Sequence, residues 1–111
     1  EGERPPAYIV ILGDTSLGST FNLDKGIAAQ TILLGAAEKN LGGCFIATVE
    51  REKLAPLLDI GKEYEITFVL PIGKPKETVV LEEIKGGDVK YWRDEDGVHH
   101  VPKRPLNEII L

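Results

Sequence analysis

The chain has 111 residues and a formal net charge of −5, with 42% hydrophobic and 28% charged residues, which is typical of one globular domain, residues 1–111. A pI near 5.0 argues against binding to nucleic acid or an anionic membrane surface, and the longest apolar runs, Ala7–Leu12 and Ile66–Ile72, are too short to cross a bilayer. Cys44 is the only cysteine, which excludes an intrachain disulfide and a multi-cysteine metal site and makes the reducing cytoplasm the expected location.

The first segments predict an exposed lead-in, a strand and a loop. Residues 1–6 are charged and proline-rich, which favours a chain that continues a longer protein over one that begins here. Ala7–Leu12 is a continuous apolar run and predicts a strand covered on both faces. Gly13–Thr20 is rich in Gly, Ser and Thr and predicts a loop.

The longest predicted element is a helix over Asn22–Asn40. Asn22 can cap it, and Asp24 in its first turn favours the positive end of the helix dipole. Apolar residues occupy nearly every face and many residues are small, so we expect a central helix that is buried nearly all round. We expect Gly42 or Gly43 to take the left-handed conformation that ends it.

Shorter elements follow. Cys44–Val49 predicts a short buried strand, and Glu50–Ile60 predicts a short helix weakened by Pro56. Tyr64–Gly73 predicts another buried strand.

The last third begins with Lys74–Lys85, which has no clear period. Val89–Pro102 predicts a hairpin, because two short runs flank an Asp-Gly turn signal at Asp94–Gly97. The tail Leu106–Leu111 is apolar, and we expect it to pack on something, such as a partner subunit.

Taken together, the order of elements predicts an α+β fold: a mixed sheet packed on the long central helix, followed by a hairpin and a tail. Such a sheet is thin for so apolar a helix. We therefore expect the chain to bury surfaces that it cannot cover by itself, through a missing portion or a partner.

Several kinds of site can be set aside. "GDTSLGST" lacks the Lys-Ser/Thr of a P-loop, and no G-x-G-x-x-G occurs. No motif places a histidine near Cys44, so a small buried thiol is the better interpretation. His99 and His100 are adjacent, so in a strand they point to opposite faces and cannot both bind one metal ion.

One basic pair remains. Lys103 and Arg104 lie between Pro102 and Pro105, and a stiff backbone would hold the two cations in place for a phosphate. Judged by spacing alone, a pair of solvated surface charges is the favoured interpretation.

Three stretches in order, "FNLDKGIAAQTILLGAAEKNLGGCFIATV", "LPIGKP" and "HHVPKRPLNEII", resemble the C-terminal half of the nitroreductase family, whose members are FMN-dependent oxidoreductases. The resemblance is specific through the ordered set of motifs and covers nearly the whole chain. The residues that match the family pattern on the helix and at its end are Asp24, Gly26, Ala28, Gln30 and Leu41-Gly42-Gly43.

The resemblance implies a site for FMN. In the family, the backbone after the helix passes the isoalloxazine ring, and a main-chain N–H points at flavin N5. It also implies that Lys103 and Arg104 bind the FMN phosphate. It implies neither a catalytic side chain nor a metal. The residues that would line the ring are Gly43, Cys44, Phe45, Ile46 and Ala47.

The resemblance further implies that NAD(P)H reduces bound FMN, which then passes electrons to a nitroaromatic, a quinone or a similar acceptor. The protein would be a homodimer with FMN at the subunit interface. The family's N-terminal Arg-rich segment and first helices have no counterpart here, so we expect a C-terminal portion with half of a flavin site. The alternatives are a non-catalytic remnant or interaction module that has lost flavin binding, and a relative with other flavin chemistry, such as dehalogenation or flavin destruction.

Overall fold

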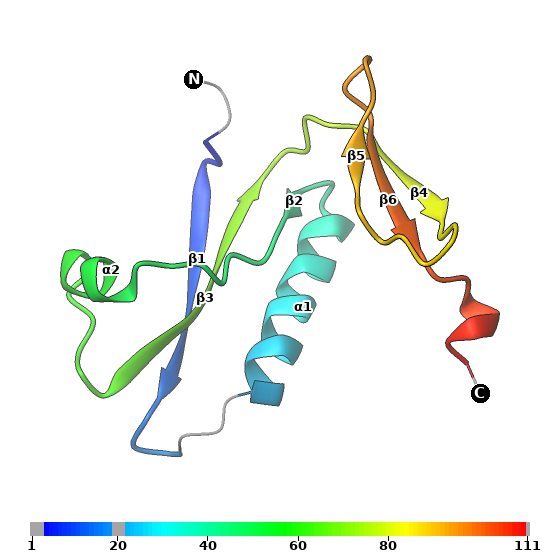
Figure 1. Cartoon of the computed structure of the whole chain (residues 1–111). Helices are drawn as coiled ribbons and strands as arrows, with labels where there is room; N and C mark the ends of the chain where they lie inside the picture. Colours follow the sequence, from blue (N-terminus) through cyan, green and yellow to red (C-terminus); the bar gives the residue numbers. More distant parts are fainter. Residues whose placement is uncertain (1–3, 19–21, 111) are drawn as a thin grey trace. The chain divides into compact units, whose positions relative to one another are not determined.

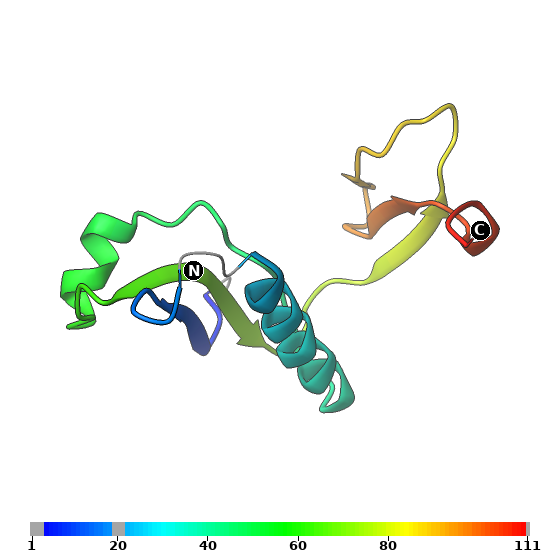
Figure 2. The same cartoon turned by 90° about the horizontal axis from the view of Figure 1, so that it is seen from below.

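The computed structural model describes residues 4–18 and 22–110, and it divides the chain into two compact units. The first unit ends at Pro75 and the second begins at Lys76. Figure 1 labels the elements of both units, and Figure 2 gives a second view. The predicted lead-in at residues 1–3, the end of the predicted loop at residues 19–20 and the last tail residue lie outside the described residues.

An antiparallel sheet with the order β1–β3–β2 forms the first unit. Strand β1 is Ala7–Asp14, β2 is Gly42–Gly43 and β3 is Tyr64–Gly73, so the prediction for β3 is confirmed at both ends. β1 pairs with Tyr64–Ile72 of β3, with a shift of register between Ile11 and Leu12 (Figure 1). Because β3 lies between two strands, it supplies most of the core: Ile66, Thr67, Val69 and Leu70 are buried.

Strand β1 is less covered than predicted. Its side chains are mostly exposed or half-buried, and Tyr8 remains 55% exposed. The prediction of a strand covered on both faces is wrong: the adjacent Tyr8 and Ile9 point to opposite faces, and both remain at least 38% exposed. Gly13 and Asp14 extend the strand beyond the predicted end at Leu12.

The long helix is present, but its predicted burial is wrong. Helix α1 spans Asn22–Glu38 with Asp24 in its first turn; the capping role of the Asn22 side chain lies outside what the structure describes. Ala29 and Ala36 are buried, whereas the larger Ile27 and Leu34 are 66% and 62% exposed. The sheet covers α1 on one side only, and the small residues face it because they allow a close approach.

The end of α1 also differs from the prediction. Asn40, with φ of 56°, takes the left-handed conformation, while Gly42 and Gly43 form β2. The Asn40 N–H donates to the Ala37 carbonyl (3.0 Å), and the Leu41 N–H donates to the Ala36 carbonyl (2.9 Å). This pair of bonds is the Schellman arrangement, which asparagine tolerates because its short polar side chain suits that conformation.

Residues 44–49 are not the buried strand that was predicted. Only Ile46 forms a bridge, with Val69 of β3. The chain then enters helix α2, Arg51–Leu57, which confirms the short helix and includes Pro56. The Arg51 guanidinium donates to the carbonyls of Ile66 (2.8 Å) and Thr67 (3.1 Å), which ties the start of α2 to β3.

The second unit is a sheet with the order β4–β6–β5. β5 (Trp92–Arg93) and β6 (His99–Lys103) form the predicted hairpin, with Gly97 at φ of 78° in its turn. β4 (Val79–Glu83) pairs parallel to β6 and was not predicted, because its sequence has no alternation. A short 3-10 helix, η1 (Leu106–Glu108), ends this unit with Leu106 72% exposed.

With strands in two sheets and few helices among the described residues, the structure confirms the α+β class. No helix in residues 4–18 and 22–110 combines the length and the apolar character that a membrane span requires.

Candidate functional site

Five of the seven candidate residues form one stretch of backbone beside β3. This stretch, Gly43–Ala47, is called the post-helix segment below. Gly43 pairs with Ile72, and Ile46 pairs with Val69, so β3 holds the segment at both points. The segment lies beside β3 because of the turn that precedes it. The Schellman turn at Asn40 reverses the chain at the end of α1, and the chain then runs along the edge of β3 opposite β1.

The backbone amides of this segment point in alternate directions. The Ile46 N–H donates to the Val69 carbonyl (3.0 Å), and the Val69 N–H donates back to Ile46 (3.2 Å). In extended backbone the neighbouring N–H groups point the other way. Accordingly, the amides of Phe45 and Ala47 have no acceptor among the described residues. They are the donors that this segment can offer to a ligand.

The side chains of the segment are mostly accessible. Cys44 is an exposed thiol, so the interpretation of a small buried thiol is wrong; the residue lies on an edge segment with no element covering it in the described part of the first unit. Phe45 is 43% exposed and contacts Phe68 edge to face, with ring centroids 5.6 Å apart. The Lys25 ammonium lies 5.6 Å from the centroid of Phe68.

The space next to Gly43 is filled by protein. A Cβ at this position would lie 2.6 Å from the Pro71 carbonyl oxygen and 2.8 Å from Leu33 Cδ2. Gly43 is therefore required for the approach of α1 and β3, whatever the segment binds.

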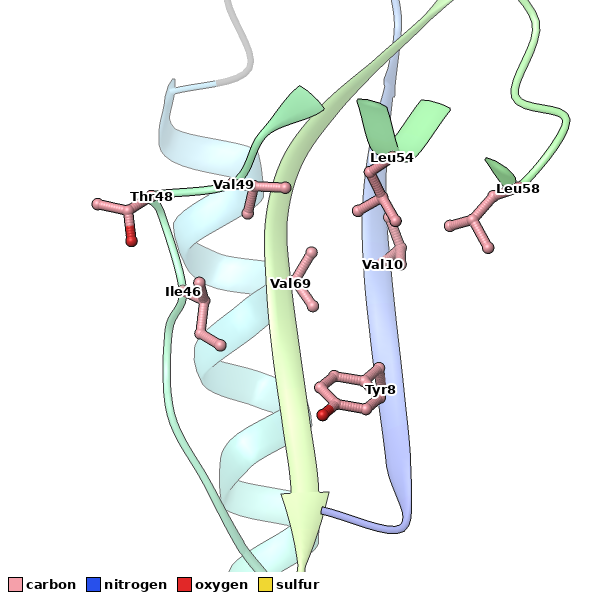
Figure 3. Close-up of a pocket in the computed structure, with 8 residues that line it drawn as sticks. All are labelled: Tyr8, Val10, Ile46, Thr48, Val49, Leu54, Leu58 and Val69. Atoms are coloured by element: carbon pink, nitrogen blue, oxygen red, sulfur yellow. The ribbon is translucent and has the colours of Figure 1, made fainter. Parts of the chain in front are cut away.

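A hollow of about 490 Å³ lies beside the segment, on the face of the sheet away from α1 (Figure 3). Its walls are apolar, and the Tyr8 and Thr48 side chains supply hydroxyl groups. Sequence reasoning missed it; the alternation of Tyr8 and Val10 in a strand was the available signal. The lining residues are Tyr8, Val10, Ile46, Thr48, Val49, Leu54, Leu58 and Val69.

Lys103 and Arg104 belong to the second unit. Both are exposed; Lys103 is the last residue of β6, opposite Glu83 of β4, and Arg104 follows it. The structure thus groups Gly43, Cys44, Phe45, Ile46 and Ala47 on one segment and leaves the two basic residues in the other unit.

The two histidines of β6 have separate partners, as their predicted opposite orientations require. His99 Nδ1 lies 3.4 Å from Glu77, and Arg93 lies 2.6 Å from the same carboxylate. The hydrogen bond from Arg93, with a smaller contribution from His99, lowers the pKa of Glu77. Among the described residues no group of His, Cys, Asp and Glu side chains could hold a metal ion.

His100 contacts Glu82 (2.8 Å) and Asp94 (3.2 Å). Hydrogen bonds to Glu82 and then to Asp94 raise the pKa of His100. The pKa of Asp94 is lowered by the hydrogen bond from His100 and by that from the Val98 amide.

Comparison with known proteins supports the resemblance over the first two thirds of the chain. The nitroreductase family model matches residues 3–74, so Lys103 and Arg104 lie outside the match. A nitroreductase family protein from Clostridium novyi NT has a similar crystal structure, with a TM-score of 0.58 and 28% identity over 65% of this chain. The match covers 44% of that protein, so the chain spans less than half of its length. No curated protein matches significantly. Because the family model covers most of the chain, including the whole post-helix segment, the chain belongs to the nitroreductase family.

Proposed function

We propose that this chain contributes to an FMN-dependent NAD(P)H oxidoreductase of nitroreductase type. The observation that carries the proposal is that the family match spans the post-helix segment, whose Phe45 and Ala47 amides are free to donate. Family membership supports flavin-dependent oxidoreduction in general. The choice of FMN, of NAD(P)H and of nitroaromatic, quinone or similar acceptors belongs to the proposal.

The residues present fit a flavin on two counts. The segment is exposed, extended backbone with outward N–H groups, which suits a flat ring with an acceptor nitrogen. In the second unit, Lys103 and Arg104 are exposed cations without an ion pair among the described residues, which suits a phosphate.

In this proposal each group has a limited task. Bound FMN would supply the hydride and electron transfer. An amide of Phe45 or Ala47 would donate to the ring, and Cys44 and Ile46 would line it. Lys103 and Arg104 would bind the phosphate. The flavin chemistry would need no side chain of this chain as a general acid or base, and the partner of a homodimer would complete the site at the subunit interface.

A flavin titration tests the proposal. The purified chain is mixed with FMN, and binding is followed by visible absorbance and by quenching of flavin fluorescence. Saturable binding of FMN, in preference to riboflavin, supports the proposal because only FMN has the phosphate. A colourless protein that ignores added FMN would favour the alternative, a non-catalytic interaction module.

A further inference from the structure

His100 lies between a carboxylate on β4 and a carboxylate in the turn directly after β5. Its Nδ1 is 2.8 Å from Glu82 Oε1, on β4, and its Nε2 is 3.2 Å from Asp94 Oδ2, directly after β5. His100 itself is on β6, the central strand. One imidazole ring, 18% exposed, therefore links β6 to β4 and to the end of β5.

The protonation state of the ring decides how many of these links exist. A neutral imidazole carries one N–H and can donate to one carboxylate only. Its second nitrogen would then present a lone pair to the other carboxylate, which is also an acceptor. A protonated imidazole donates from both nitrogens, and each hydrogen bond joins opposite charges. The observed geometry, with a carboxylate oxygen at each nitrogen, is satisfied only by the charged ring.

The surroundings hold the ring in this position. Trp92 of β5 stacks on it with centroids 4.9 Å apart and planes 3° from parallel. The Val98 amide donates to Asp94 (2.8 Å), which fixes that carboxylate in the hairpin turn.

The other charged side chains on these three strands lie on the opposite face, because side chains alternate along a strand. Next to His99, Glu77 is paired with Arg93. Glu83 and Lys103 follow the same alternation and share that face. The charged groups that face His100 from β4 and from the turn after β5 are thus Glu82 and Asp94, both acidic.

We propose that His100 is a protonation-dependent latch of the second unit: the charged ring holds β4 and β5 against β6, and the neutral ring releases one of them. The proposal does not depend on the proposed flavin function. The direction with pH follows from linkage. A histidine whose pKa is raised in the folded state contributes stability that is complete below its ordinary pKa, about 6.5. Hydrogen bonds to Glu82 and Asp94 raise the pKa of His100. The contribution to stability is therefore lost as the pH rises through this raised pKa, because the ring then loses its second N–H. The latch therefore opens toward alkaline pH.

A titration of the whole chain tests the latch. Trp92 is the only tryptophan, so its fluorescence reports on the stacked ring. The His100 imidazole resonances in NMR spectra give its pKa directly. We expect a pKa in the native chain above that of the same residue in the urea-unfolded chain. We also expect the Trp92 fluorescence to change at the same pH. Above that pH, hydrogen exchange of the β5 and β6 amides should be less protected, relative to the unfolded chain at the same pH.

Conservative variants separate the latch from a structural role. Asp94→Asn and Glu82→Gln each remove one negative charge, so each should lower the midpoint by about one pH unit. His99→Gln, on the opposite face, is the matched control and should leave the midpoint in place. The proposal is overturned by a His100 pKa that is not raised on folding. It is equally overturned if the folded Asp94→Asn and Glu82→Gln variants keep the original midpoint of the His100 titration. A protection of the β5 and β6 amides that does not follow this titration would overturn it as well.

Discussion

At the scale of single residues, Gly43 lies in a space with no room for a side chain. The Pro71 carbonyl and the Leu33 side chain occupy the position where a Cβ would be placed. Ala47, four residues later in the post-helix segment, is exposed. The two positions thus separate a packing effect from a ligand effect.

We predict that Gly43→Val destabilises the first unit by about 1–3 kcal/mol, the usual cost of overpacking, and lowers FMN occupancy. Ala47→Ser should change stability by less than about 0.5 kcal/mol, because the site is exposed and the change is small. Urea unfolding gives the stabilities and a flavin titration gives the occupancies. Equal FMN binding by both variants would show that the glycine serves the junction of α1 and β3 alone.

The basic pair allows a second prediction at this scale. Replacing both Lys103 and Arg104 with Ala should weaken FMN binding more than tenfold, because each charged hydrogen bond to a phosphate contributes about 1.5–3 kcal/mol. Both side chains are exposed, so the fold should be unchanged. Lys85→Ala with Lys90→Ala removes the same charge from exposed positions of the same unit and is the control. Unchanged affinity in the titration would remove Lys103 and Arg104 from the site.

At the scale of elements, the C-terminus of α1 sets where the post-helix segment begins. Asn40 holds the left-handed conformation, and two backbone hydrogen bonds close the turn. That turn, and not the pair of glycines, ends the helix. Gly42 and Gly43 are then free to pair with β3.

We predict that Asn40→Gly stabilises the chain by a few tenths of a kcal/mol, since glycine adopts this conformation without steric cost. Asn40→Val should destabilise it by about 1–2 kcal/mol, because a β-branched side chain is strained there. Urea unfolding measures both. Ala28→Gly, at an exposed position inside the helix, should instead cost about 1 kcal/mol. If glycine destabilised position 40 as much as position 28, the turn would not depend on the left-handed conformation.

At the scale of the whole molecule, much apolar surface remains exposed within each unit. Leu23, Ile27 and Leu34 form the outer face of α1, 62–79% exposed. In the second unit, Leu106, Ile109 and Ile110 are 59–72% exposed. Apolar area removed from water contributes about 25 cal/mol per Å², so surfaces of this kind favour association.

We predict that the 111-residue chain alone is not a stable monomer. Sedimentation or light scattering should show dimers or larger species. Ile27→Lys with Leu34→Lys should shift them toward monomer, because both changes place a charge on the outer face of α1. Exposed Thr31→Lys with Glu38→Lys is a control that adds charge without removing large apolar side chains.

The expected incompleteness of the flavin site bears on activity. We expect no NADH oxidation above background when FMN is added to the chain alone, since half of the flavin site is expected from elsewhere. A monomer that turns over with FMN would contradict both the association and the expectation of a C-terminal portion.

The amino-acid sequence by itself determined the features that depend on neighbouring residues. The bounds of β3, the run of α1 and the β5–β6 hairpin follow from local patterns: an apolar run, helical spacing and an Asp-Gly turn. The ordered motifs also predicted the family, which the comparison confirmed. The roles of the seven candidate residues toward FMN stay predictions.

Only the tertiary structure decided what lies against each element. The pattern of α1 shows apolar residues on nearly every face, but it cannot show that the sheet covers one side and leaves Leu34 exposed. Likewise, the local sequence is compatible with a glycine that ends the helix. The structure shows instead that Gly43 is needed because Leu33 and Pro71 leave no room for a side chain. Glu82 is 18 residues from His100 along the chain, and their contact exists because β4 and β6 pair in parallel. Burial and charge pairing are properties of distant contacts, and local periodicity carries no information about which distant residues will meet.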